Sequence, residues 1–96
     1  MTEIKIYERA GTFAEDKDVA REIRINEIMP LLGAKRKVIL DFQNVDAATQ
    51  SFVHALISEA IRKNGLQVLD QLRFKNCNQT VKKIINIVVD YMQDVE

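Results

Sequence analysis

The chain has 96 residues, which is the size of one small domain. Hydrophobic residues make up 47% of it and charged residues 29%, with three Gly and one Pro, so disorder, collagen-like repeats and low-complexity linkers are excluded. Fourteen basic residues balance fourteen acidic ones, and this zero net charge argues against nucleic acid or an anionic membrane as the partner.

The sequence offers few ligands for a metal and no segment for a membrane span. Cys77 is the one cysteine and His54 the one histidine, so neither an internal disulfide nor a four-ligand zinc site built from these residue types can form. No apolar run approaches the roughly 18 residues of a spanning helix, and the first residues lack the pattern of a secretion signal. We therefore expect a cytoplasmic protein without a metal or cofactor.

The first third of the chain predicts a strand followed by a helix. Ile4 and Ile6 alternate with polar residues, which is the period of a strand with one buried face. Residues 12–15, Thr-Phe-Ala-Glu, have the spacing of a capping box, so we expect a helix to begin there. Pro30 is expected to kink this helix or open a new turn, and Gly33 to cap its end. The helix carries apolar residues at helical spacing: Val19, Ala20, Ile23, Ile28 and Met29.

The middle of the chain predicts a buried strand with a helix close behind it. Residues 38–42, Val-Ile-Leu-Asp-Phe, are nearly all apolar, which favours a central strand covered by helices on both faces. Asp46, Thr49 and Ser51 then offer alternative N-caps. The helix that follows has a wide apolar stripe: Phe52, Val53, Leu56, Ile57, Ala60 and Ile61.

The last third predicts a weaker strand and a final helix. The strand is expected within residues 67–74, and Asn76 and Asn78 favour a turn and a new helix cap. Apolar residues then step by three and four: Val81, Ile84, Ile85, Val88, Met92 and Val95. Ile87 and Val89 are further apolar positions on this helix, which either form a dimer or partner surface or pack inside the fold.

The element order is therefore strand, helix, strand, helix, strand, helix. This order predicts parallel pairing in an α/β fold, a small sandwich of three to four short strands with three helices, over a single domain of residues 1–96.

The sequence contains few residues in patterns typical of a catalytic site. Ser51 and His54 share a helix face but lack the signs of a nucleophile elbow or oxyanion donors, and Cys77 is typical of a partly buried small residue. We expect no enzyme and no catalytic residue.

Thr49 and Ser51 stand at the edge where open α/β sheets carry their functional loops, after the central strand. A phosphate at this helix start would be stabilised by free backbone amides and the helix dipole, and would add nearly two negative charges. Both a modification switch and ordinary helix caps fit these residue types.

Several short stretches together resemble one family. They are residues 38–45 with Asp41-Phe42, then Ser51-Phe52, then residues 73–76 ending at Asn76, then residues 81–85. This pattern, an apolar strand ending in Asp-Phe, Ser-Phe opening a helix and a strand ending near Asn before a last helix, resembles the STAS-like family of small prokaryotic domains. The resemblance spans roughly residues 12–92.

The resemblance implies a relation to the STAS domains of anti-sigma factor antagonists. Those domains bind a histidine-kinase-like ATPase, which phosphorylates a serine at the start of the helix after the central strand. Counting without gaps from Asp41, Ser51 falls on this phosphoacceptor position, while Thr49, Gln50 and Phe52 replace the other residues of the Asp-Ser-Ser-Gly motif.

The leading hypothesis is a non-enzymatic regulatory module that docks on a protein partner. The resemblance implies a histidine-kinase-like ATPase, with Ser51 as the phosphoacceptor. We expect contact through residues 46–57, namely Asp46, Thr49, Gln50, Ser51, Phe52 and His54. The alternative is a structural homo-oligomeric subunit, at least a homodimer, of a prokaryotic defence or mobile-element system, with the final helix supplying the contact.

Overall fold

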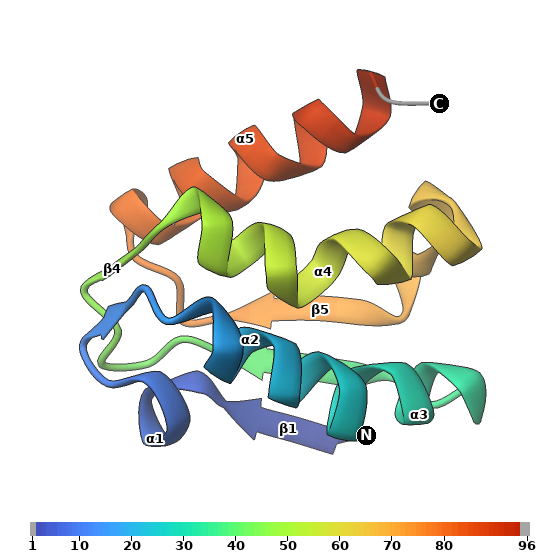
Figure 1. Cartoon of the computed structure of the whole chain (residues 1–96), viewed down its shortest axis with the longest axis horizontal. Helices are drawn as coiled ribbons and strands as arrows, with labels where there is room; N and C mark the ends of the chain where they lie inside the picture. Colours follow the sequence, from blue (N-terminus) through green and yellow to red (C-terminus); the bar gives the residue numbers. More distant parts are fainter. Residues whose placement is uncertain (1, 95–96) are drawn as a thin grey trace.

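Three parallel strands form the main sheet of the computed structural model, which describes residues 2–94 (Figure 1). Strand β3 (Val38–Asp41) lies in the centre, between β1 (Thr2–Lys5) and β5 (Leu72–Lys75). In the register, Leu40 stands opposite Ile4 on one side and Phe74 on the other. The predicted α/β fold, its parallel pairing and its central strand are confirmed.

Two further short strands form a second parallel pair, β2 (Phe13–Ala14) with β4 (Ala47–Ala48). The Thr49 amide donates to the Ala14 carbonyl at 3.0 Å, which continues this pairing. The prediction that residues 12–15 begin a helix is wrong, because the pairing with β4 takes their backbone groups. The helix begins instead after Asp16, whose side chain accepts a hydrogen bond from the Asp18 amide at 2.9 Å.

The remaining elements are helical. They are α1 (Ile6–Ala10), α2 (Lys17–Ile23), the π-helical turn η1 (Arg24–Ile28), α3 (Met29–Gly33), α4 (Gln50–Asn64), the 3-10 turn η2 (Leu66–Asp70) and α5 (Gln79–Asp94). Two predictions change. Ile6 opens a helix rather than ending a strand, and the strand expected within residues 67–74 is limited to its second half by η2. Val95 lies outside the described residues.

Pro30 and Lys35 shape the continuous helical segment formed by α2, η1 and α3. Because Pro30 has no N–H and its ring crowds the preceding turn, α3 begins at Met29 after the wider π turn, in which the Met29 amide donates to the Arg24 carbonyl. Gly33 is the last residue of α3, but the left-handed conformation that ends the helix belongs to Lys35, at φ 61°. The Lys35 amide donates to the Leu32 carbonyl at 2.9 Å, which closes the end.

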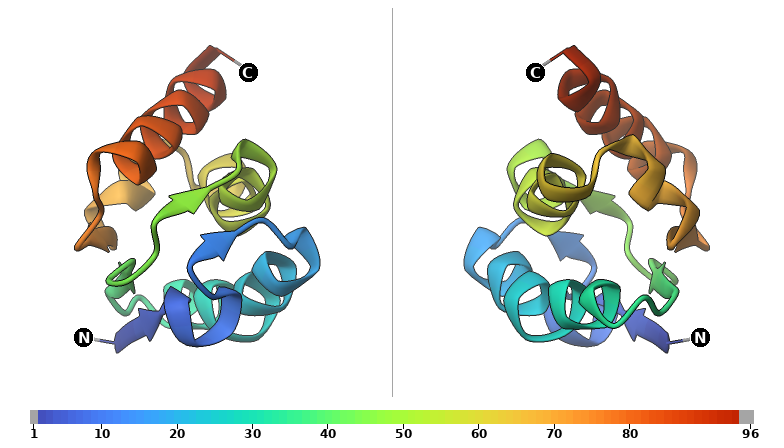
Figure 2. Two further views of the ribbon diagram at one scale, coloured as in Figure 1. Left: turned by 90° about the vertical axis from the view of Figure 1, so that its left-hand side faces the viewer. Right: turned by 90° about the vertical axis from the view of Figure 1, so that its right-hand side faces the viewer.

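The main sheet is covered on one face only, and the prediction of helices on both faces is wrong. Figure 2 shows the helices on one side of β1, β3 and β5. Side chains alternate accordingly: Leu40 faces the helices and is buried, while Ile39 lies on the other face between Glu3 and Arg73 in the register. The open face is mostly charged and exposed, with Glu3, Lys5, Lys37, Arg73 and Lys75.

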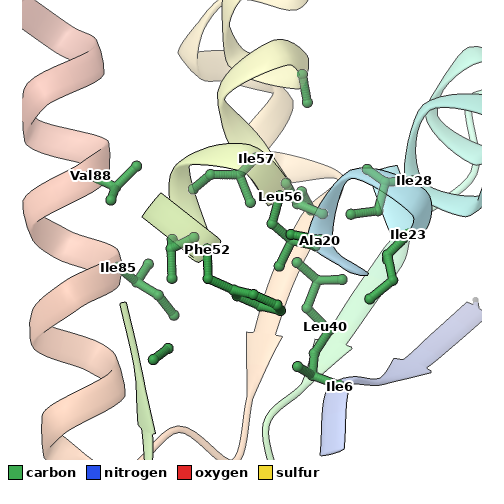
Figure 3. Packing of buried hydrophobic residues seen from close by; sticks show 14 of the residues in the cluster. Ile6, Ala20, Ile23, Ile28, Leu40, Phe52, Leu56, Ile57, Ile85 and Val88 are labelled. Atoms are coloured by element: carbon green, nitrogen blue, oxygen red, sulfur yellow. The ribbon is translucent and has the colours of Figure 1, made fainter. Parts of the chain in front are cut away.

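The core lies between this sheet and the helices (Figure 3). Its largest fully buried side chains include Phe42, Phe52, Ile6, Ile23, Ile28, Leu40, Leu56 and Ile57. Helix α4 packs on α2 and on α5, so α5 is an outer layer that reaches the core through one stripe, namely Val81, Ile85, Val88 and Met92 (Figure 1). None of the described helices is long and apolar enough to cross a membrane.

Candidate functional site

Thr49 caps helix α4 directly after β4. Its Oγ1 accepts a hydrogen bond from the Phe52 amide at 3.1 Å and lies 3.2 Å from the Ser51 hydroxyl oxygen. Of the alternative caps that the sequence offers, Thr49 is therefore the one used. Ser51 follows in the first turn with an exposed side chain. The free backbone amides of a helix start favour an anion bound there.

Ser51 lines an open groove of about 620 Å³ between α4 and α5. We call this the α4–α5 groove; Gln50 and His54 line it from α4, and Ile87 and Tyr91 from α5, together with Lys17, Ala55 and Val88. The rings of His54 and Tyr91 meet edge to face across it, with centroids 6.2 Å apart and 62° between their planes. The groove thus places a hydroxyl beside aromatic and aliphatic surface.

Two large apolar side chains stand exposed at the α5 wall of the groove. Ile87 is 37% and Tyr91 57% exposed. Single exposed apolar residues are ordinary, but two beside a groove are typical of an interaction surface. Of the two apolar positions singled out in the sequence, Ile87 is on this surface and Val89 packs against the core. Tyr91 was missed, although its spacing of four from Ile87 places both on one helix face.

The predicted partner-binding residues do not all lie on one surface. Gln50, Ser51 and His54 line the α4–α5 groove. Asp46 is exposed in the loop before β4, and Thr49 is half-buried as the cap.

Phe52 does not belong to this surface, and its prediction as a partner-binding residue is wrong. Its side chain is 0% exposed and points into the core near Leu40 and Ala20 (Figure 3). Neighbours on a helix point about 100° apart, so Ser51 faces solvent while Phe52 faces the sheet.

The hydroxyl of Ser51 and the ring of His54 do not form a nucleophile–base pair. Among residues 2–94 no hydrogen bond joins them: Ser51 Oγ contacts Thr49 Oγ1, and the His54 ring contacts Tyr91. A serine hydrolase needs the base within hydrogen-bond reach of the hydroxyl. The described geometry of the groove therefore fits binding better than this chemistry.

Asp41 and Asn76 form a second polar cluster, at the carboxyl end of the main sheet. Asp41 Oδ1 accepts hydrogen bonds from Asn76 Nδ2 and from the Gln43 amide, each at 2.9 Å. These two donors lower the pKa of Asp41 below its ordinary value of 3.8. Asn76 holds the left-handed conformation at φ 59°, which asparagine tolerates. These two residues of the family-like pattern join the ends of β3 and β5.

Asn78 extends the same connection toward the groove. Its Nδ2 donates to the Asp46 carbonyl at 2.9 Å, and its Oδ1 accepts from the Val81 amide at 2.8 Å. One side chain therefore caps α5 and holds the loop that leads into β4 and α4. The walls of the α4–α5 groove are fixed relative to each other by this cap and by the core.

Cys77 lies between these two asparagines and faces another opening. It lines a groove of about 530 Å³ with Phe74, Asn76, Lys82, Ile85 and Asn86. Burial raises the pKa of the Cys77 thiol, which therefore stays protonated at neutral pH. Within residues 2–94 the side chains of His, Cys, Asp and Glu form no group of three or more that could hold a metal ion.

Comparison with known proteins agrees with this architecture. The model of a family described as a STAS-like domain of unknown function (DUF4325) matches residues 19–82, which run from α2 through β3, α4 and β5 to the first turn of α5. No curated protein and no solved structure matches the chain. Because the family model covers well over half of the sequence, this chain belongs to the STAS-like domain family.

Proposed function

We propose that the chain is a non-enzymatic regulatory interaction module, which docks on a protein partner through the α4–α5 groove and is switched by a phosphate on Ser51. One observation carries this proposal: Ser51 is exposed in the first turn of α4 and lines the same groove as the exposed Ile87 and Tyr91. Docking surface and modification site would then be one place.

The partner that we propose is a histidine-kinase-like ATPase. The support is membership of the STAS-like family together with the ungapped count from Asp41, which aligns Ser51 with the phosphoacceptor of anti-sigma factor antagonists. The local structure is compatible with the modification, because the Ser51 side chain is exposed and stands at a helix start, where amides and dipole favour a phosphate.

The groove also indicates how a phosphate would act. A phosphoserine carries nearly two negative charges at neutral pH, and burying them against Ile87 and Tyr91 under an apolar partner costs desolvation. Lys17 is the lining residue with a full positive charge and would pair with the phosphate in the free protein. Phosphorylation would therefore favour the undocked state.

The test is to incubate the protein with ATP and histidine-kinase-like ATPases from its native cell, then to map added phosphate by mass spectrometry. Thr80 is the matched internal control: it is exposed and second in α5 after the Asn78 cap, as Ser51 is second in α4 after Thr49. We expect phosphate on Ser51 and none on Thr80.

Two outcomes would count against the switch. Equal labelling of Ser51 and Thr80 would mean that the enzyme modifies any exposed helix start. A bound ATPase that leaves Ser51 unmodified would remove the phosphate from the proposal and leave docking alone.

A further inference from the structure

Helix α5 carries a second apolar stripe beside its buried one. Ile84, Ile87 and Tyr91 are spaced by three and four residues, so they share one face of the helix. Ile84 is half-buried, whereas Ile87 and Tyr91 are exposed. Helix α5 forms an outer layer of the fold (Figures 1 and 2), and Ile87 and Tyr91 on this face line the α4–α5 groove. A helix laid against the stripe would therefore also cover the groove.

Two opposite charges border the outer edge of this stripe. Lys83 and Asp90 are both exposed and lie two helical turns apart on the same edge, one on each side of Ile87 along the axis. If a second α5 ran antiparallel, with the two Ile87 side chains at the crossing, Lys83 of each copy would face Asp90 of the other. In a parallel two-fold pair the edge that carries Lys83 and Asp90 in one copy would lie across the seam from the same edge of the other, so these charges would stay unpaired. The charge pattern selects the antiparallel arrangement.

We propose that two copies of this chain associate through an antiparallel pair of α5 helices, related by a two-fold axis near Ile87. Each copy then inserts the same residues into the same surface of the other, as a two-fold interface requires. Ile87 and Tyr91 of one copy cover the α4–α5 groove of its mate. The dimer also places Ser51 at the edge of the covered surface, so self-association and partner docking exclude each other.

The size of the surface predicts a weak dimer. A 16-residue helix is about 24 Å long, so one helix pair with the adjoining groove lies near the lower end of the roughly 1,200–2,000 Å² that stable interfaces bury. We expect the monomer to dominate at about 1 μM and the dimer to be evident at about 100 μM. Sedimentation equilibrium across this range measures the dissociation constant directly.

Charge reversal gives the sharpest test. Lys83→Glu places two acidic groups opposite each other at both ends of the helix pair, and Asp90→Lys does the same with two basic groups. We expect each single variant to weaken dimerisation at least tenfold, and the double variant Lys83→Glu/Asp90→Lys to restore it. Lys82→Glu is the matched control, because Lys82 is exposed on α5 with the same charge but outside the stripe. Its dissociation constant should equal that of the wild type.

A strictly monomeric wild type up to about 1 mM would overturn this inference, and so would single reversals that leave the dimer intact or a double variant that stays monomeric. Equal weakening by Lys82→Glu would assign the effect to net charge and overturn it as well. Circular dichroism of each variant checks that the fold is retained. The measurement uses neither ATP nor an ATPase, so its failure is separate from any failure of the Ser51 switch.

Discussion

At the scale of single residues, Asp41 and Asn76 of the family-like pattern have a structural role. Asp41 and Asn76 hold the ends of β3 and β5 together through one side-chain hydrogen bond. The sequence placed both residues in the family-like pattern but could not pair them, because the contact joins positions 35 apart in the chain. Ser51 was singled out as a possible N-cap and modification site and again through the same resemblance, but its exposure could not be read from the residue type.

The contribution of the Asn76 side chain can be measured without disturbing the backbone. Asn76→Gly keeps the left-handed conformation but removes the amide that donates to Asp41. A hydrogen bond to a charged group is worth about 1.5–3 kcal/mol, so we expect urea denaturation to show a loss of about 2 kcal/mol. Asn44→Gly is the control, because Asn44 has φ 71° and no side-chain hydrogen bond among the described residues. Equal losses in the two variants would contradict this role of Asn76.

The same variant has a defined pH dependence. The folded-state pKa of Asp41 is lowered from 3.8, so the ionised carboxylate stabilises the fold above pH 3.8, and this stabilisation is lost as the pH falls through the lower folded-state value. In Asn76→Gly the folded-state pKa of Asp41 should move back toward 3.8, so acidification should remove less of the free energy of unfolding. Urea midpoints at pH 7 and pH 3 should therefore differ less for Asn76→Gly than for the wild type; an equal or larger difference would contradict the cause assigned to the shift.

At the scale of elements, the sequence predicts the helices and strands that have a clear hydrophobic periodicity. It fails for segments whose structure depends on pairing with a distant part of the chain. The central strand, α4 with its cap among the named alternatives, and α5 all follow from local patterns. Residues 12–15 have a helix-start pattern, yet they form β2 because β4 supplies a strand partner more than thirty residues away. The one-sided sheet was missed for a related reason: a nearly unbroken apolar run does not reveal that Ile39 faces outward.

Two phenylalanines, Phe52 in α4 and Phe13 in β2, differ strongly in burial. Phe52 is 0% exposed in the core, whereas Phe13 in β2 is 49% exposed. Phe52→Ala should cost about 3–5 kcal/mol through lost burial and a cavity, a large part of the stability of a small domain, whereas Phe13→Ala should cost less than about 1 kcal/mol. Thermal or urea denaturation of the two variants compares them directly. A mild effect of Phe52→Ala would contradict the burial of Phe52 in the core.

At the scale of the whole molecule, a charged open sheet face and the partly apolar α4–α5 groove are two different surfaces. The open face of the main sheet carries exposed charges of both signs and one ion pair, between Lys75 and Glu3 at 3.2 Å. Such a face stays hydrated and contributes little to stability. The α4–α5 groove combines exposed apolar groups with a helix-start hydroxyl. The partner docking, self-association and modification that we propose would all use this one surface.

Zero net charge makes that surface sensitive to modification. With fourteen positive and fourteen negative residues, one phosphate is a large change in the local field of the groove. The sequence indicated this balance and the family, but the convergence of Ser51 with Ile87 and Tyr91 needs the packing of α5 on α4, which no local pattern specifies.

The most direct test of the account is the affinity of the proposed ATPase partner for the unmodified and the Ser51-phosphorylated protein, measured by isothermal titration calorimetry. We predict that the phosphate weakens binding at least tenfold, about 1.4 kcal/mol, and that Ile87→Asp weakens binding of the unmodified protein to a similar degree. Equal affinities for the two forms would contradict control of docking at Ser51.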